Sequence, residues 1–512
     1  MKYKNPIISG FYPDPSICRV GEDYYLVTSS FEYFPGVPIF LSRDLIHWEQ
    51  IGHCLTRESQ LPLKGVEPSG GIWAPTIRYH ECTFYMTTTN MNAQGNFYVY
   101  TDDPAGEWSE PIWISMGGID PSLTFDGDKV YYTTNQCAPD KTPGISQVEI
   151  DIETGKLIGD IKFIWEGSGG KMGEATHLYK IGDYYYLMIA EGGTQFTHME
   201  TIARSKSPWG PFESCPRNPI LTNMQARILD IHCTGHGDLV EDQNDNWWMV
   251  HLGIRIARKY MSHLGRETFL SPVEWDEDGW PIVNYGKCIT LISDGPCLPT
   301  VDVKKEIEMD HFDGNKLEFC WNYLRNPYPE DYSMSYIKSC MTLWGNPSSI
   351  SDIDSPAMIA RRQKYFNCEI STAFEFSPVK ENEEAGVVIF ITNEYYYKIV
   401  KRRINGKMYI VLEKRVEDFL PIAACVEIEE KQLHIKVIAD KLKYIFYFGY
   451  SPTEMIKIAE ASTRFLACEV AARCFTGTYV GIYASGNGCR ATVPACFDYF
   501  SLKEYDETVV GS

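Results

Sequence analysis

The sequence predicts an all-β protein in which a five-bladed β-propeller is followed by a β-sandwich domain. Five related stretches recur at intervals of roughly 45–60 residues, which is the spacing of four-stranded propeller blades. Later segments such as CEISTAFEF, AGVVIFITN and LHIKVIAD alternate with period two and lack helical stripes, as is typical of a sandwich. We therefore expect a propeller over residues 1–295, a connector over 296–306 and a sandwich over 307–509.

Each of the five stretches has the pattern of a β-hairpin. A short apolar strand leads into a polar or Gly-containing turn, and a second strand rich in aromatic residues follows. The first and third are nearly alike, DPSICRVGEDYYL from Asp14 and DPSLTFDGDKVYY from Asp120. The other three begin at Ala74, Glu174 and His236. Further strands after each hairpin complete a blade.

The composition argues against several classes of function. The 512 residues carry a formal net charge of -21, whereas nucleic-acid binding depends on cations that neutralise phosphates. No segment is apolar enough to span a bilayer, and the N-terminal residues lack the apolar core of a signal peptide. We expect a soluble, cytoplasmic protein with neither a nucleic-acid nor a membrane partner. The 16 cysteines lack short paired spacings, which favours reduced thiols over disulfides.

The segment IHCTGHGD brings together His232, Cys233 and His236, which are residue types that bind zinc. The tight ligand pairs of zinc sites are missing, however. We therefore interpret this segment as the beginning of a strand.

The residues that open the five stretches form the candidate site. The first strand of each blade lines the propeller axis, so equivalent positions converge at one end of that axis. Asp14, Asp120 and Glu174 would face one another there with His236, and Ala74 completes the ring. The proline after each aspartate disfavours the α region, which predicts an extended or turn conformation. Converging like charges cost stability, which indicates a functional reason for them.

Converging carboxylates on an aromatic-rich scaffold indicate the hydrolysis of glycosides. This reaction needs one acid that is protonated, to assist the leaving group, and another that is ionised, to activate water or to attack carbon. A third carboxylate nearby raises the pKa of the proton donor and keeps it protonated near neutral pH.

Several segments closely resemble glycoside hydrolase family 43, in particular its β-xylosidase and α-L-arabinofuranosidase members. They include NPIISGFYPDPSICRVGEDYYL, GGIWAPTIRY, GGIDPSLTFDGDKVYYTTN, TGHGDLVED and LGRETFLSPVEW. The segments LEFCWNYLRNP, ARRQKYFNCEISTAFEF and FDYFSL are similar to the concanavalin-like C-terminal sandwich of those members. The resemblance covers nearly the whole chain and implies an inverting hydrolase.

The resemblance implies a role for each acid. Asp14 matches the general base that activates the attacking water, and Asp120 matches the acid that tunes and orients the proton donor. Glu174 matches the general acid, in a motif that usually reads Glu-Gly-Pro-His and here reads Glu-Ala-Thr-His. This departure changes the loop and retains the carboxylate.

The resemblance also implies residues that contact the sugar. His236 matches a histidine at the pocket floor that binds water or a Ca²⁺ ion in many members, although no cofactor is required. Arg266 matches an arginine that contacts sugar hydroxyls, and Phe497 is expected to reach the substrate from the sandwich. The expected substrate-binding set is Phe31, Trp73, Ala74, His236, Arg266 and Phe497.

The expected substrate is a xylo-oligosaccharide or an arabinoxylan-derived oligosaccharide, from whose non-reducing end the enzyme releases xylose, arabinofuranose or both. The two sugars present similar hydroxyl geometry, so α-L-arabinofuranosidase as the main activity stays open. A homo-oligomer is compatible with the sequence.

Two more distant functions fit the sequence less well. A non-catalytic carbohydrate-binding propeller would need aromatic platforms without the full acid set. A fructan-type hydrolase, which also joins a propeller to a sandwich, acts by retention and carries Asn-Asp-Pro, Arg-Asp-Pro and Glu-Cys motifs. Here YPDP replaces the first motif, Ile119 replaces the arginine before Asp120, and Glu81-Cys82 lies in a turn of the wrong blade.

Overall fold

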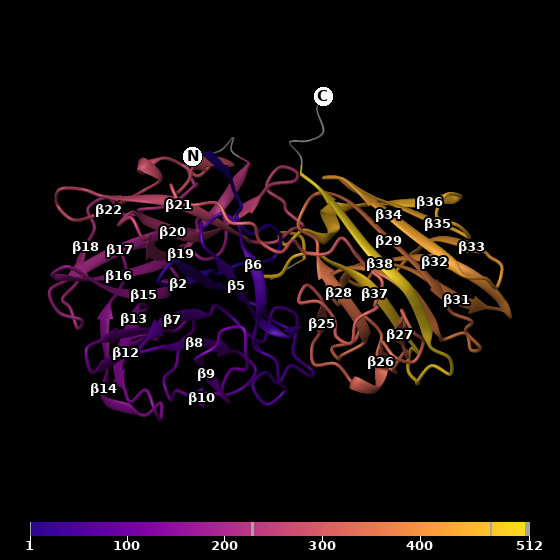
Figure 1. Cartoon of the computed structure of the whole chain (residues 1–512), viewed down its shortest axis with the longest axis horizontal. Coiled ribbons are helices and arrows are strands. Elements are labelled where there is room, and N and C mark those ends of the chain that lie inside the picture. The colour runs from indigo at the N-terminus through magenta and orange to yellow at the C-terminus, as the bar shows by residue number, and fades with distance from the viewer. Residues whose placement is uncertain (1, 227–229, 472–473, 507–512) are drawn as a thin grey trace.

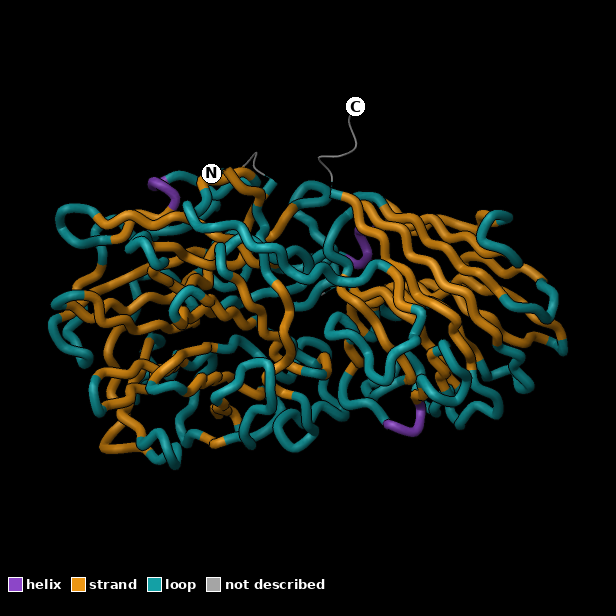
Figure 2. The backbone as a smooth tube through the Cα atoms, viewed as in Figure 1, coloured by secondary structure: helices purple, strands orange, loops and turns teal. Residues whose placement is uncertain are grey.

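Almost all regular structure in the computed structural model, which describes residues 2–226, 230–471 and 474–506, is β-strand (Figure 2). Five four-stranded sheets lie beside two larger sheets formed by the C-terminal part of the chain (Figure 1). The helical segments in these ranges are η1 (Asn284–Gly286), η2 (Pro329–Asp331) and η3 (Thr463–Leu466). No helix of the described ranges is long and apolar enough to cross a membrane. The predicted fold class, a propeller followed by a sandwich, is confirmed.

Each propeller blade consists of four antiparallel strands. Blade one contains β2 (Ser16–Val20), β3 (Asp23–Val27), β5 (Gly36–Ser42) and β6 (Glu49–Leu55). Blade two contains β7 (Thr76–His80), β8 (Thr83–Asn90), β9 (Gly95–Thr101) and β10 (Ile112–Trp113). Blade three contains β11 (Ser122–Asp126), β12 (Lys129–Thr134), β13 (Ile145–Ile150) and β14 (Leu157–Trp165).

The last two blades follow the same order. Blade four contains β15 (Glu174–Ile181), β16 (Tyr184–Glu191), β17 (Met199–Ser205) and β18 (Glu213–Ser214). Blade five contains β19 (Ile231–Glu241), β20 (Trp247–Arg255), β21 (Glu267–Trp275) and β22 (Pro281–Val283). Every predicted hairpin therefore forms the first two strands of a blade.

The innermost strands close a ring around the propeller axis. β2 contacts β7, β7 contacts β11, β11 contacts β15, β15 contacts β19, and β19 contacts β2. The N-terminal segment is bound to the last part of the propeller. β1 (Lys2–Lys4) pairs with β23 (Ile292–Asp294), and the Asn5 side chain forms hydrogen bonds with the backbone N–H and carbonyl of Leu270 in blade five. The ring brings the starts of all five inner strands to the axis.

The C-terminal domain is a sandwich of two antiparallel sheets. The first sheet runs β26 (Tyr332–Ser333), β27 (Met341–Leu343), β38 (Ala495–Tyr505), β29 (Asn367–Glu375), β34 (Leu433–Ala439), β35 (Lys443–Gly449) and β36 (Met455–Ser462), with β24 (Met309–Asp310) also on β38. The second sheet runs β33 (Ile422–Glu427), β32 (Lys407–Val416), β31 (Tyr395–Ile404), β30 (Glu384–Thr392), β37 (Tyr479–Ser485), β28 (Ala357–Arg362), β25 (Asn322–Leu324) and β4 (Tyr33–Phe34).

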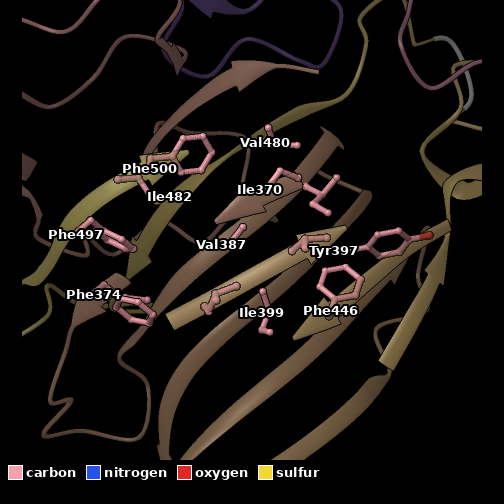
Figure 3. Close-up of a cluster of buried hydrophobic side chains, with 14 of the residues drawn as sticks. Ile370, Phe374, Val387, Tyr397, Ile399, Phe446, Val480, Ile482, Phe497 and Phe500 are labelled. Atoms are coloured by element: carbon pink, nitrogen blue, oxygen red, sulfur yellow. The ribbon is translucent and has the colours of Figure 1, made fainter. Parts of the chain in front are cut away.

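The sandwich core lies between these two sheets (Figure 3). Period-two alternation directs every second side chain of a strand inward, as with Val387 and Ile389 on β30, each at most 1% exposed. They meet side chains such as Ile370 and Phe446 from the facing sheet. The alternation seen in the sequence thus supplies this core.

One strand crosses between the domains and fixes the sandwich against the propeller. β4 follows β3 of blade one in sequence, yet it pairs with β25 at the edge of the second sandwich sheet. The Tyr33 ring stacks on Tyr479 of that sheet with ring centroids 3.8 Å apart. Since β4 comes shortly after Phe31, this contact places the sandwich next to the end of the propeller axis where the acids lie.

Candidate active site

The predicted ring of polar side chains is present at one end of the propeller axis. Asp14 and Asp120 lie two residues before β2 and β11, Glu174 begins β15, and His236 lies within β19. Asp14, Asp120 and His236 are 3%, 6% and 5% exposed, and Glu174 is half-buried. The charges of Asp14 and Glu174 both act on Asp120 and raise its pKa, so the three carboxylates share one site.

The backbone at the two aspartates is a left-handed turn. Of the two conformations expected before proline, extended or turn, the structure has φ of 56° at Asp14 and 50° at Asp120. His236 has the same conformation, with φ of 53°. Aspartate and histidine tolerate this region better than most residues. The same turn therefore opens the approach to the axis in three blades.

Glu174 does not share the register of the two aspartates, which corrects one expectation. Counted back from the hairpin turn, the position of Asp14 and Asp120 corresponds in blade four to Ala175, whose φ of 55° is also left-handed. A register shift between Glu174 and His177 places Glu174 one residue earlier. The bulge re-aims the side chain, as bulges beside functional sites often do.

Asp14 is held as a carboxylate by the groups around it. Arg266 donates from Nη1 to Oδ1 at 2.6 Å and from Nη2 to Oδ2 at 3.2 Å, and the Ser29 hydroxyl donates to Oδ2 at 2.5 Å. His236 Nδ1 lies 3.6 Å from Oδ1. Burial alone would raise the pKa of Asp14, but Arg266, His236 and Ser29 outweigh it and lower the pKa below the ordinary value. Asp14 is therefore ionised at neutral pH.

Asp120 and Glu174 have the opposite electrostatics. Burial, followed by the charges of Glu174 and Asp14, raises the pKa of Asp120 well above its ordinary value. Burial and the charge of Asp14 raise the pKa of Glu174 to about 7, against the opposing effect of Arg266. This pair retains a proton near neutral pH while Asp14 is ionised. The site therefore holds a proton acceptor and a proton donor at the same pH.

Three aromatic side chains pack beside the acids. Phe31 is 2% exposed, Trp73 is half-buried, and their ring centroids are 6.4 Å apart. Phe475 of the sandwich completes the group, with its centroid 6.0 Å from Phe31 and 5.7 Å from Trp73. The Arg266 guanidinium lies over Phe31 and Phe475, at 5.7 and 5.8 Å from their centroids. Aromatic walls of this kind offer apolar faces to a sugar ring.

The expectation that Phe497 reaches the substrate is wrong. Phe497 is fully buried in the sandwich core, where it stacks on Phe374 at 5.0 Å (Figure 3). Its place on β38 turns the ring toward the facing sheet. Phe475 reaches the site instead: its N–H donates to Ser69 Oγ at 2.9 Å, and its carbonyl accepts from Arg266 Nη2 at 3.4 Å.

Sequence reasoning also missed Ser29, Thr194 and His198. Ser29 bonds Asp14, Thr194 Oγ1 accepts from Arg266 Nη1 at 3.2 Å, and His198 is a buried neighbour whose charge would act on Asp14. None of them sits in a repeated position, so the repeat gave no signal for them. Gly477, two residues after Phe475, is the sequence feature that marks the close approach of this loop to the propeller. A Cβ at Gly477 would lie 2.3 Å from the Leu264 carbonyl oxygen. Only glycine permits the sandwich loop to approach the propeller that closely.

Ala74 lies at the blade-two position that corresponds to Asp14 and is 4% exposed. Ala74 adds no charge to the set of side chains at the axis. Its contact with the substrate stays a prediction. Thr194, Arg266 and Phe475 also line a cavity of about 390 Å³ at the junction of propeller and sandwich. Cavities of this size accommodate small ligands.

The expected Ca²⁺ ion at His236 stays a prediction. Calcium takes roughly six to eight oxygen ligands, but the nearest carboxylate, Asp14, is already occupied by Arg266. In residues 2–226, 230–471 and 474–506, no group of three or more His, Cys, Asp or Glu side chains is arranged to hold a metal ion. The segment from His232 to His236 accordingly runs within β19, as expected for the beginning of a strand.

Comparison with known proteins gives consistent results over both domains. Residues 3–281 match the family described as Glycosyl hydrolases family 43, and residues 309–503 match the Beta xylosidase C-terminal Concanavalin A-like domain. A non-reducing end alpha-L-arabinofuranosidase of Bacteroides ovatus is 42% identical over 98% of this chain and 95% of its own length. A xylosidase/arabinosidase of Butyrivibrio fibrisolvens is 40% identical over 98% of this chain and 99% of its own. The crystal structure of a xylan beta-1,4-xylosidase from Bacillus halodurans superposes with a TM-score of 0.93 at 35% identity, covering 98% of this chain and all of the other.

Proposed function

The chain belongs to glycosyl hydrolase family 43 and is a glycoside hydrolase, and we propose that it releases xylose, arabinofuranose or both from the non-reducing ends of xylo-oligosaccharides or arabinoxylan fragments, with inversion. The names of the two relatives support these sugars. The observation that carries the chemistry is the pairing of Asp14 with Arg266, which lowers the pKa of Asp14, beside the Asp120–Glu174 pair, whose pKa values are raised. An inverting hydrolase needs one ionised and one protonated carboxyl at the same pH.

In the proposed mechanism, Asp14 accepts a proton from the water that attacks the anomeric carbon. As the new bond to the water oxygen forms, the bond to the glycosidic oxygen breaks, and Glu174 donates its proton to that oxygen. Asp120 helps to keep Glu174 protonated before the step. Arg266 aligns Asp14 and, with the rings of Phe31 and Trp73, binds the sugar. Exchange of protons with solvent then restores both acids.

Turnover of the 4-nitrophenyl β-D-xylopyranoside and α-L-arabinofuranoside tests this proposal, with NMR of the first product formed. We expect α-xylose as the initial product from the β-xyloside, because one displacement inverts the anomeric carbon. An initial product with retained configuration would support the fructan-type alternative instead. The absence of turnover on both substrates, with ligand binding retained, would support the non-catalytic propeller.

Arabinofuranosidase as the main activity is the second candidate, because a relative with 42% identity carries that name. The two activities separate by the ratio of kcat/KM on the two nitrophenyl substrates. Product analysis on xylobiose and on arabinoxylan fragments then shows which natural linkage is cleaved. A higher kcat/KM on the arabinofuranoside, with no xylose from xylobiose, would establish this second candidate.

We further propose a cytoplasmic location, where the substrates would be short imported oligosaccharides, without nucleic-acid or membrane partners. Cell fractionation tests the location, and sedimentation analysis tests for a homo-oligomer. Removal of Ca²⁺ with EDTA is expected to change kcat less than about twofold, because Asp14 is already paired with Arg266 and few oxygen ligands remain for the ion. A loss of activity that added Ca²⁺ restores would instead establish the predicted calcium site at His236.

A further inference from the structure

A buried ion pair lies further along the propeller axis from the catalytic ring. Asp238 of β19 is fully buried, and its Oδ2 accepts from Arg78 Nη1 of β7 at 2.8 Å. A second contact joins Arg78 Nη2 to Asp238 Oδ1 at 3.3 Å. Burial would raise the pKa of Asp238, but the charge of Arg78 and the hydrogen bonds from Arg78 and Ser16 lower it to about 2. The pair is therefore charged at neutral pH.

One end of this pair holds the strand that follows the base. Asp238 Oδ2 accepts from the Ser16 hydroxyl at 2.6 Å and from the Ile17 backbone N–H at 3.0 Å. Ser16 and Ile17 begin β2, directly after the Asp14-Pro15 turn. Asp238 is itself two residues beyond His236, whose ring faces Asp14. The Asp238 carboxylate thus binds the start of β2, which follows Asp14, to β19, which carries His236 beside Asp14.

The other end holds the strand of the acid. Arg78 Nη2 lies 2.9 Å from His177 Nδ1, three residues after Glu174 on β15. Burial lowers the pKa of His177 to about 3, so its ring is neutral and Nδ1 accepts the hydrogen bond from the guanidinium. The Tyr179 hydroxyl of the same strand donates to Asp238 Oδ1 at 2.6 Å. Both members of the pair therefore bind β15 just beyond its bulge.

We propose that Arg78 and Asp238 are positioning residues that set the separation and orientation of the base Asp14 and the acid Glu174. The inference rests on the proposed function. An inverting reaction requires a fixed gap that admits one water molecule between sugar and base. Asp14 and Glu174 come from blades one and four, which are not neighbours in the ring, so adjacent-strand contacts alone do not tie them. The ion pair, whose members come from blades two and five, reaches across the axis and forms hydrogen bonds with both blade one and blade four.

A purely structural role makes a different prediction. Buried ion pairs contribute little net stability, and replacing both members by apolar residues of similar volume is often neutral for folding. Removing one member alone leaves an uncompensated buried charge and destabilises the fold. The test therefore needs variants that separate positioning from folding.

The first test is Arg78→Lys, which retains the charge but loses the fork that binds Asp238 and His177 together. We expect kcat on the nitrophenyl substrate to fall at least about tenfold, since displacement of a catalytic group by about 1 Å costs on the order of 100-fold. KM should stay within about threefold, because neither residue contacts the sugar in the proposed mechanism. The basic limb of the kcat profile should also move below pH 7, as Glu174 leaves the buried place beside Asp14 that raises its pKa. An unchanged kcat and pH profile would overturn the proposal.

The second test is the double variant Arg78→Met with Asp238→Leu. If the pair positions the acids, the melting temperature recovers relative to Asp238→Leu alone while kcat stays at least about tenfold low. If kcat recovers together with the melting temperature, the role is structural and the proposal fails. Should the double variant not fold, the Arg78→Lys result decides.

The matched control is Glu384→Gln in the sandwich, where Glu384 is buried and paired with Lys398 at 2.7 Å. It should lower the melting temperature without changing kcat or its pH profile. If the wild-type enzyme turns over neither nitrophenyl substrate, the proposed function fails rather than this inference. If the wild type is active and Glu384→Gln lowers kcat as much as Arg78→Lys, the inference fails.

Discussion

Asp14 and Asp120 are written in the same D-P-S motif and adopt the same left-handed turn, yet their electrostatics are opposite. Asp14 forms an ion pair with Arg266 and lies beside His236, and these neighbours lower the pKa of its carboxyl despite burial. Asp120 is equally buried but faces Glu174, and its pKa is raised. The difference comes from groups in blades four and five, across the axis. The motif aims a carboxylate, and distant neighbours determine its proton affinity.

The largest expected difference between the two aspartates is in turnover. Asp14→Asn removes the proposed base, and we expect kcat to fall by about 1,000-fold, within the range usual for loss of general base catalysis. Binding of xylobiose, measured by calorimetry, should persist because the side chain keeps its shape. Asp126→Asn, at the end of β11 away from Asp120, where Asp126 pairs with Lys180, is the control and should retain wild-type kcat. Substantial turnover by Asp14→Asn would contradict the assignment of the base.

Removing the cation should make Asp14 resemble Asp120. Without Arg266, burial dominates and the pKa of Asp14 rises. Because the base must be ionised, activity is lost below the new pKa, so the acid limb of the kcat/KM profile moves to higher pH in Arg266→Met. We expect kcat/KM at neutral pH to fall by about 100-fold, the loss typical of a misplaced catalytic group.

Arg266→Lys is the matched variant because it retains a positive charge. Its acid limb should lie closer to that of the wild type, although loss of the bidentate contact still lowers kcat. An acid limb that is the same in wild type, Arg266→Met and Arg266→Lys would show that Asp14 is not the titrating base.

Asp120→Asn should lower activity less than Asp14→Asn, by about 10- to 100-fold, because it removes a tuning group. The charge of Glu174 raises the pKa of Asp120, and the same repulsion makes a charged Asp120 disfavour ionisation of Glu174. The basic limb, set by the pKa of Glu174 at about 7 in the wild type, should therefore move to lower pH in the variant. A basic limb unchanged from the wild type would contradict the role of Asp120.

The stability of Asp120→Asn provides a second measurement. The folded-state pKa of Asp120 is raised above its unfolded value, so its contribution to stability is full below that unfolded value and is lost as pH rises through the folded pKa. The neutral asparagine has no such loss. We expect its melting temperature to exceed that of wild type by about 1–3 °C at pH 8 and to show no gain at pH 4.

Two phenylalanines of the sandwich extend the comparison, because identical side chains again differ only in their surroundings. Phe475→Ala should raise KM by about three- to tenfold, the equivalent of roughly 1 kcal/mol of lost apolar contact, with little change in melting temperature. Phe497→Ala should leave KM unchanged in the folded enzyme and lower the free energy of unfolding by about 3–5 kcal/mol, because it opens a core cavity. Thermal melts and kinetics on both variants check this. Reversed effects would restore the original expectation for Phe497.

Repetition in the sequence was sufficient to predict the propeller and the acids. A blade cannot bury its faces alone, so a propeller must repeat its hairpin pattern, and that pattern is local. The D-P-S motif marked Asp14 and Asp120, and the third acid, Glu174, followed from the alignment of aromatic strands. The bulge that shifts Glu174 by one residue was not predictable, because it depends on how β15 pairs with β16.

The sequence by itself determined which strands form and which carboxylates reach the axis, because side-chain alternation and turn residues act between near neighbours. Only the tertiary structure decided which acid keeps a proton, since Arg266 acts on Asp14 from 252 residues away in the chain. It also decided that Phe475 rather than Phe497 meets the site, because that choice depends on how the sandwich packs on the propeller through β4. Electrostatic and packing effects depend on distances in space. The sequence alone does not give the distances between residues that are far apart in the chain.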